Sequence, residues 1–93
     1  MKTYAKVLGR RIWIKGSQTS GWRAAKTPEP SAREMPFNFS ITDDGAGNFL
    51  LVYCSEDGSL HGDTWHETLQ HAYTSAEQEF GIERDEWSQS VPL

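Results

Sequence analysis

The stretch that decides the fold is residues 63–82, DTWHETLQHAYTSAEQEFGI. Apolar side chains recur in it at steps of three and four residues: Trp65, Leu69, Ala72, Tyr73, Ala76 and Phe80. On a helix this spacing places them within an arc of about 100°, as one apolar stripe. The sequence therefore predicts an amphipathic helix over residues 63–81.

Both ends of this segment carry helix-terminal signals. Thr64 and Glu67 have the spacing of a capping box, in which the hydroxyl and the carboxylate each accept a hydrogen bond from a backbone N–H group. Gly81 can adopt the left-handed conformation that ends a helix, and Ile82 can then fold back onto the last turn. We expect a helix that is capped by Thr64, buries Trp65 and stops at Gly81.

A hairpin is predicted over residues 36–54. Residues 37–42 alternate between apolar and polar side chains, which is typical of a strand with one face on the core. The run FLLVYC at residues 49–54 is apolar on both faces and predicts an interior strand. Between the two strands, residues 43–48 are dense in turn-forming residues.

The first 35 residues are less regular. Residues 1–15 contain two strand-like segments that meet at Gly9, either as a hairpin with a two-residue turn or as one long strand with a bulge. Residues 16–35 are polar, contain several glycines and prolines, and are predicted as a loop. Trp22 and the alanines after Arg23 could add a short returning strand within it.

These elements combine into an α+β fold within a single domain over residues 1–93. We expect an antiparallel sheet of three to four strands with one amphipathic helix packed on one face. Residues 82–93 form a tail, in which one helical turn places Trp87 against the sheet or the helix, and the last six residues are frayed.

Composition indicates a cytoplasmic protein. The lone cysteine, Cys54, cannot form an internal disulfide, and its place at the end of an apolar run predicts a buried structural thiol. The longest apolar run is six residues, and the N-terminal segment is interrupted by charges. We therefore expect neither a signal peptide nor a membrane span.

The net charge of −4 conceals a division along the chain. Residues 1–33 hold eight basic residues against one acidic residue, or +7, and residues 34–93 hold twelve acidic residues against one basic residue, or −11. We expect basic strands to be neutralised by an acidic helix beside them. The alternative is a nucleic-acid surface, whose basic residues would be Lys6, Arg10, Arg11, Lys15, Arg23 and Lys26.

No catalytic or metal-binding residues are predicted. His66 and His71 resemble the H-E-x-x-H zinc motif, but they are five residues apart, and on a helix their side chains would diverge by about 140°. The adjacent acidic pairs lie in turns or in the tail, where such residues are common. We expect no enzyme activity, no cofactor and no metal.

The strand FLLVYCSEDG, the segments GDTWHETL and AEQEFGI, and the closing Trp87 form a pattern over residues 36–87. It resembles small single-domain bacterial proteins of unassigned function, some of which travel on mobile gene cassettes or act as immunity-like partners beside polymorphic toxins. The resemblance implies a fold rather than an activity and assigns no catalytic residue.

The leading functional hypothesis is a non-catalytic protein-binding module, which acts on a protein partner or pairs with itself as a homodimer through a spare apolar sheet face. Acidic helix residues would steer a basic partner, and tryptophans would anchor it. The candidate partner-binding residues are Glu67, His71, Glu77, Trp13 and Trp22. A second alternative is a small-molecule-binding protein with an aromatic pocket between the long loop and the sheet.

Overall fold

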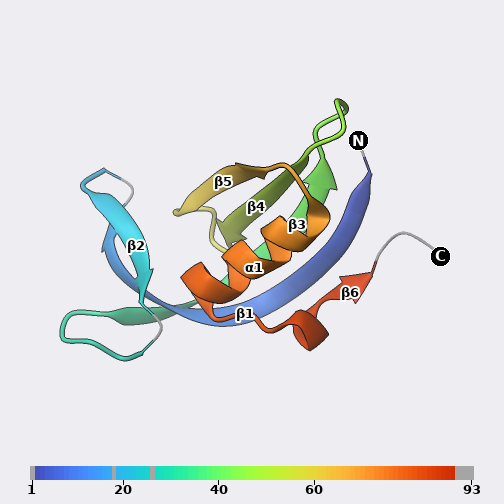
Figure 1. Ribbon diagram of the computed structural model, residues 1–93. Coiled ribbons are helices and arrows are strands. Elements are labelled where there is room, and N and C mark those ends of the chain that lie inside the picture. The colour runs from blue at the N-terminus through green and yellow to red at the C-terminus, as the bar shows by residue number, and fades with distance from the viewer. Residues whose placement is uncertain (1, 18, 26, 90–93) are drawn as a thin grey trace.

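An antiparallel sheet makes up most of the fold. Within residues 2–17, 19–25 and 27–89, which the computed structural model describes, five strands pair in the order β2-β1-β3-β4-β5, and a short strand β6 pairs with β1. Figure 1 shows β1 curving around α1, so that the sheet forms a trough with the helix inside it. The elements are β1 (Thr3–Ser17), β2 (Gly21–Ala25), β3 (Arg33–Asp43), β4 (Phe49–Ser55), β5 (His61–His66), α1 (Leu69–Phe80), the 3-10 helix η1 (Arg84–Glu86) and β6 (Ser88–Gln89).

The hairpin predicted over residues 36–54 is present as β3 and β4, which pair from Phe37 opposite Ser55 to Asp43 opposite Phe49. Asp44 stabilises the turn between them. Its carboxylate accepts hydrogen bonds from the backbone N–H groups of Ala46 and Asn48 at 2.8 and 3.0 Å. These bonds, led by the one from Ala46, hold the pKa of Asp44 below its usual value.

The first strand is continuous and contains a bulge. The pairing of β1 with β3 shifts register between Val7 and Arg10, so that Leu8 and Gly9 together lie opposite Asn38. Gly9 has a φ of 67°, and its N–H group donates to Oδ1 of Asn38 at 2.9 Å. Of the two alternatives for Gly9, the long strand with a bulge is therefore confirmed, and the two-residue turn is wrong.

The prediction of a loop over residues 16–35 is wrong in part. Strand β2 lies within it and pairs with the end of β1, where Trp22 is opposite Gly16, and β3 already begins at Arg33. Trp22 and Ala24 pack against the core. This burial stabilises a strand of five residues that is too short for its alternation to identify.

Strand β5 occupies part of the predicted helix. It pairs with β4 and places Trp65 opposite Leu50 on the convex face of the sheet, where Trp65 is 53% exposed. The prediction of Trp65 as a core residue is therefore wrong. The physical reason is that β4 is apolar on both faces, and β5 supplies the neighbour that its second edge requires.

The helix is capped four residues later than predicted. Thr68 is the N-cap, and its hydroxyl accepts a hydrogen bond from the N–H group of His71 at 3.0 Å. The capping box of Thr64 and Glu67 does not form, because Thr64 lies within β5. From Leu69 onward the predicted apolar stripe is confirmed, with Ala72, Tyr73, Ala76 and Phe80 buried.

The C-terminal end of the helix is confirmed. Gly81 is left-handed, with a φ of 74°, and its N–H group donates to the carbonyl of Glu77 at 2.9 Å. Ile82 folds back onto the last turn and is fully buried. After η1, Trp87 packs edge-on against Tyr73, with ring centroids 5.5 Å apart.

The core lies between the concave face of the sheet and α1, which confirms the α+β class with one helix on one face. The predicted three to four strands are too few, because β2 and β5 were assigned to the loop and the helix. Residues 88–89 of the predicted frayed tail pair with β1, and residues 90–93 lie outside the described residues. Cys54 points to the convex face and is half-buried, so the prediction of a buried thiol is wrong.

Candidate functional site

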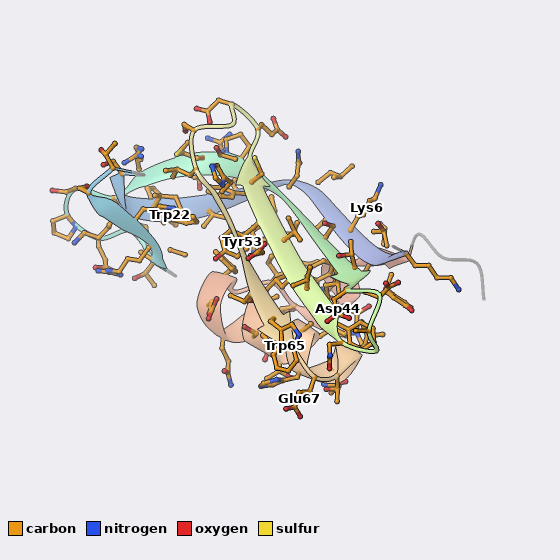
Figure 2. The ribbon with its side chains drawn as sticks, turned by 90° about the horizontal axis from the view of Figure 1, so that it is seen from above. Lys6, Trp22, Asp44, Tyr53, Trp65 and Glu67 are labelled. Carbon is orange, nitrogen blue, oxygen red and sulfur yellow. The ribbon has the colours of Figure 1, made fainter. Side chains whose placement is uncertain are left out.

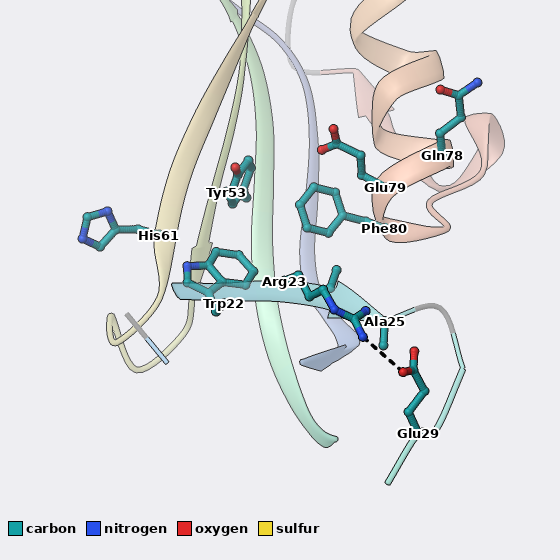
Figure 3. A pocket seen from close by; sticks show the side chains of 10 residues that line it. Trp22, Arg23, Ala25, Glu29, Tyr53, His61, Gln78, Glu79 and Phe80 are labelled. Carbon is teal, nitrogen blue, oxygen red and sulfur yellow. Dashed lines mark hydrogen bonds and ion pairs between the residues drawn. The ribbon is translucent and has the colours of Figure 1, made fainter. Parts of the chain in front are cut away.

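One end of the trough is left open beside the helix and forms a cavity of about 580 Å³. As Figure 3 shows, β2 closes the cavity on one side, β4 and β5 on the second, and the last turn of α1 on the third. Glu29, from the connection between β2 and β3, completes the rim. The cavity therefore lies where four separate parts of the chain meet.

Three aromatic rings form its apolar wall. The ring centroid of Tyr53 lies 5.8 Å from that of Trp22 and 4.9 Å from that of Phe80. The Trp22 and Tyr53 rings are nearly perpendicular, at 81°, and those of Tyr53 and Phe80 are tilted by 55°. Because the rings come from β2, β4 and α1, the wall forms only when all three elements are packed together.

The position of Tyr53 depends on Gly62. The two residues are paired across β4 and β5. A Cβ atom added at Gly62 would lie 2.8 Å from Cε2 and 2.9 Å from the hydroxyl oxygen of Tyr53, closer than unbonded atoms approach. Any other residue at this position would therefore displace the tyrosine ring.

The wall also carries a hydroxyl group and a carboxylate. Burial raises the pKa of Tyr53, and the nearby carboxylates of Glu79 and Asp63 raise it further. Its phenol therefore keeps its proton at neutral pH. Glu79 stands on the last turn of α1, and no ion pair between the residues that the structure describes involves its carboxylate.

The second carboxylate of the rim, Glu29, is already paired. Its Oε1 lies 3.2 Å from Nη2 of Arg23 and 3.6 Å from Nζ of Lys15. The hydrogen bond from Arg23 is the main reason why the pKa of Glu29 lies below its usual value. This cluster ties the connection before β3 to the β1–β2 hairpin and places a carboxylate beside Arg23 at the rim (Figure 3).

The residues predicted to bind a partner do not form one surface. Glu67, His71 and Glu77 are exposed on and before α1, whereas Trp13 is half-buried on the convex face of β1. Trp22 belongs to the concave side and lines the cavity. The sheet thus separates Trp13 from Trp22 and from His71 and Glu77 on α1.

Ion pairs occupy most of the residues of the predicted nucleic-acid surface. In the described residues these are Arg10 with Glu86, Arg11 with Glu34, and Lys15 and Arg23 with Glu29. Their acidic partners come from the tail and the first 34 residues, rather than from the helix as expected. Lys6 is exposed at the end of the molecule far from Trp22 (Figure 2), and Lys26 lies outside the described residues. Nucleic-acid binding stays a prediction.

The two histidines lie together, in contrast to the expected divergence. Their ring centroids are 5.0 Å apart, because His66 ends β5 and His71 lies in the first turn of α1, rather than both being helical. His66 is 6% exposed, and its Nε2 lies 2.7 Å from the hydroxyl of Thr64. Burial, and next the neighbouring His71, lower the pKa of His66. The described residues contain no group of three or more His, Cys, Asp or Glu side chains placed to hold a metal ion.

Sequence reasoning missed most of the cavity wall. Trp22 was singled out, but Tyr53 and Phe80 follow the strand and helix patterns of core residues, and Glu79 resembles any solvated helix residue. Only the folded structure distinguishes a ring that fills a core from one that lines a cavity. No protein-family model, curated protein or solved structure matches the chain. No helix in the described part of the chain is long and apolar enough to cross a membrane.

Proposed function

We propose that this protein binds a small organic molecule in the aromatic pocket and does so without catalysis. The observation that supports this function is the wall of three rings, drawn from three elements, around a cavity of about 580 Å³. Ligand pockets in proteins commonly have volumes of about 300–1,000 Å³ and combine apolar walls with a few polar groups. A ligand would pack on Trp22 and Tyr53, while the Tyr53 hydroxyl and the Glu79 carboxylate would fix its orientation.

A fragment screen by two-dimensional NMR tests the proposal. Fragments should shift the indole N–H signal of Trp22 and the backbone signals of Tyr53 and Phe80, because these residues line the cavity. The proposal is wrong if hits shift only residues outside the cavity, or if the library gives no saturable shifts at all.

Matched variants locate the site. Trp22→Ala removes one wall of the cavity, whereas Trp65→Ala removes a tryptophan from the convex face, outside the cavity. We expect the first variant to lose at least about tenfold in fragment affinity, which is the size of effect for one aromatic stacking partner, and the second to lose nothing. Gly62→Ala, which displaces the Tyr53 ring without removing it, is the second test should Trp22→Ala fail to fold.

A second candidate function is self-association through the convex face of the sheet. The two large apolar side chains that are most exposed within the described residues, Leu8 at 71% and Trp65 at 53%, both lie on this face. Light scattering coupled to size exclusion, at low and at moderate salt, tests this function. A dimer that persists in salt and is lost in Leu8→Ser with Trp65→Ser would support self-association, and a monomer at all concentrations would exclude it.

A further inference from the structure

The charged side chains around the aromatic pocket differ in whether they form ion pairs. Arg23 faces the rim and pairs at 3.2 Å with Glu29, which Lys15 also approaches at 3.6 Å from outside the pocket lining. On the other side of the pocket, the carboxylate of Glu79 has no ion-pair partner among the described residues. Among the described residues the pocket lining therefore holds two carboxylates and one guanidinium, and Glu79 is the carboxylate without an ion-pair partner.

We propose that the ligand carries a positively charged, substituted ammonium group, held between the rings of Trp22 and Tyr53 and the carboxylate of Glu79. This inference rests on the proposed function, since it names the class of ligand for the same pocket. The rest of the cavity would hold an apolar body attached to that group.

The arrangement of the rings supports a cation. The face of an aromatic ring is electron-rich and attracts a cation within about 6 Å of its centroid, and tryptophan and tyrosine are effective partners. Trp22 and Tyr53 meet at 81° with centroids 5.8 Å apart, so that they form two walls of a corner. Phe80 adds a third ring next to Tyr53 (Figure 3). A compact alkylammonium group can contact more than one of these rings at once.

The electrostatic environment of Tyr53 points the same way. Two carboxylates, Glu79 on α1 and Asp63 on β5, act on its phenol and oppose a negative charge there. The potential that opposes a phenolate favours a cation at the same place. An anionic ligand would approach Glu79 with like charge, and at Arg23 it would compete with Glu29.

Three probes of nearly equal shape test the charge of the ligand. Choline carries a trimethylammonium group, 3,3-dimethylbutan-1-ol is its neutral analogue with a tert-butyl group, and 3,3-dimethylbutanoate is an anionic relative. Each is titrated into the full chain by NMR, with the shift of the Trp22 indole N–H signal as readout. We expect choline to bind at least about tenfold more tightly than the alcohol, from ring and carboxylate contacts together, and the anion to bind most weakly.

Two single-charge variants of α1 sharpen the test. Glu79→Gln should lower the affinity for choline about three- to tenfold and leave the alcohol unchanged. Glu77→Gln, which removes the same charge from the same helix outside the aromatic pocket, should change neither affinity.

The outcomes separate the inference from the proposed function. If the alcohol or the anion binds as tightly as choline at the Trp22 signal, the ammonium class is wrong while ligand binding in the pocket stands. The same conclusion follows if all three probes fail but other fragments bind there. If neither the probes nor the fragment library shift Trp22, Tyr53 and Phe80, the proposed function fails and the inference fails with it.

Discussion

The two ends of the trough differ in what fills them. At the end beneath α1, Phe39, Ile41 and Leu51 are at most 1% exposed. At the other end Trp22 and Tyr53 remain half-exposed around a cavity. The lengths of the elements explain the difference: α1 has 12 residues and spans about 18 Å, whereas the 15 residues of the curved β1 follow a path of up to about 50 Å. The helix cannot cover the whole concave face.

Because of this difference, we expect the covered end of the sheet to contribute most to stability and the open end to contribute most to binding. The covered end is packed from long strands and the helix, so that its side chains cannot move without leaving a void. The open end depends on β2, which has five residues, and on one ion-paired connection. We therefore expect substitutions at the covered end to act on unfolding and substitutions at the open end to act mainly on binding.

The largest expected effect is that of Phe39→Ala. Phe39 is 1% exposed and contacts the rings of Phe37, Tyr53 and Phe80. The variant should lose about 3–5 kcal/mol in free energy of unfolding, from lost burial and the cavity left behind. Trp22→Ala should lose about half as much, because Trp22 is half-exposed. Urea unfolding measures both, and equal losses would mean that the open end belongs to the core.

The next largest effect is expected for Gly16→Ala, which should disturb the pairing of β2 with β1 and leave the covered end intact. A Cβ atom at Gly16 would collide with the backbone carbonyl of Gly21 and approach Cα of Trp22 to 2.9 Å, and Gly16 also has a φ of 93°. We expect a loss of about 1–3 kcal/mol, faster hydrogen exchange in β2 and a loss of fragment binding.

Gly21→Ala provides the control for this prediction. Gly21 has a similar φ of 88°, but nothing lies within 4 Å of an added Cβ atom. It should therefore show the conformational cost without the collision. If both variants behave alike, backbone conformation rather than the close approach at Gly16 controls the hairpin.

The covered end is also where the sequence was most informative. The alternation of residues 37–42, the apolar run at 49–54 and the stripe from Leu69 to Phe80 each predict an element that the structure contains. Gly81 ends the helix as predicted, since its left-handed backbone is a local property. These signals depend on the residues of one segment alone.

The predictions were wrong where contacts with other segments determine the secondary structure. Thr64 and Thr68 are four residues apart, so that helices starting at either have the same stripe, and Trp65 fits one more turn of it as well as it fits β5. Periodicity cannot choose between them, but pairing with β4 does. The pocket is less predictable still, because its three rings, those of Trp22, Tyr53 and Phe80, come from distant parts of the sequence. Trp22 reaches the other two through β2, which the sequence analysis gave only as an alternative within a loop.

A smaller effect tests the helix start at the covered end. Thr68→Ala removes the hydroxyl that accepts from the N–H group of His71, and we expect it to lose about 1 kcal/mol in free energy of unfolding. Thr68→Ser keeps the acceptor and should lose much less. Fragment binding should be unchanged in both, since the N-cap lies outside the cavity. Equal stability of Thr68→Ala and the unaltered chain would contradict this cap.

The smallest expected effect is a pH dependence at the covered end. Burial, and then the charge of His71, lower the pKa of His66 in the folded state below its ordinary value of 6.5. As pH falls, the unfolded chain therefore protonates its histidine before the folded chain does. The contribution of His66 to the free energy of unfolding is fully present above about pH 6.5 and is lost as pH falls through that value toward the folded pKa.

Urea unfolding across this range measures the dependence of the free energy of unfolding on pH. His66→Gln should reduce its slope by an amount that corresponds to less than one bound proton. His71→Gln should reduce the contribution of His66 only in part, because burial is the larger cause of its shift. An unchanged slope in His66→Gln would mean that the ring of His66 is more hydrated than its 6% exposure indicates.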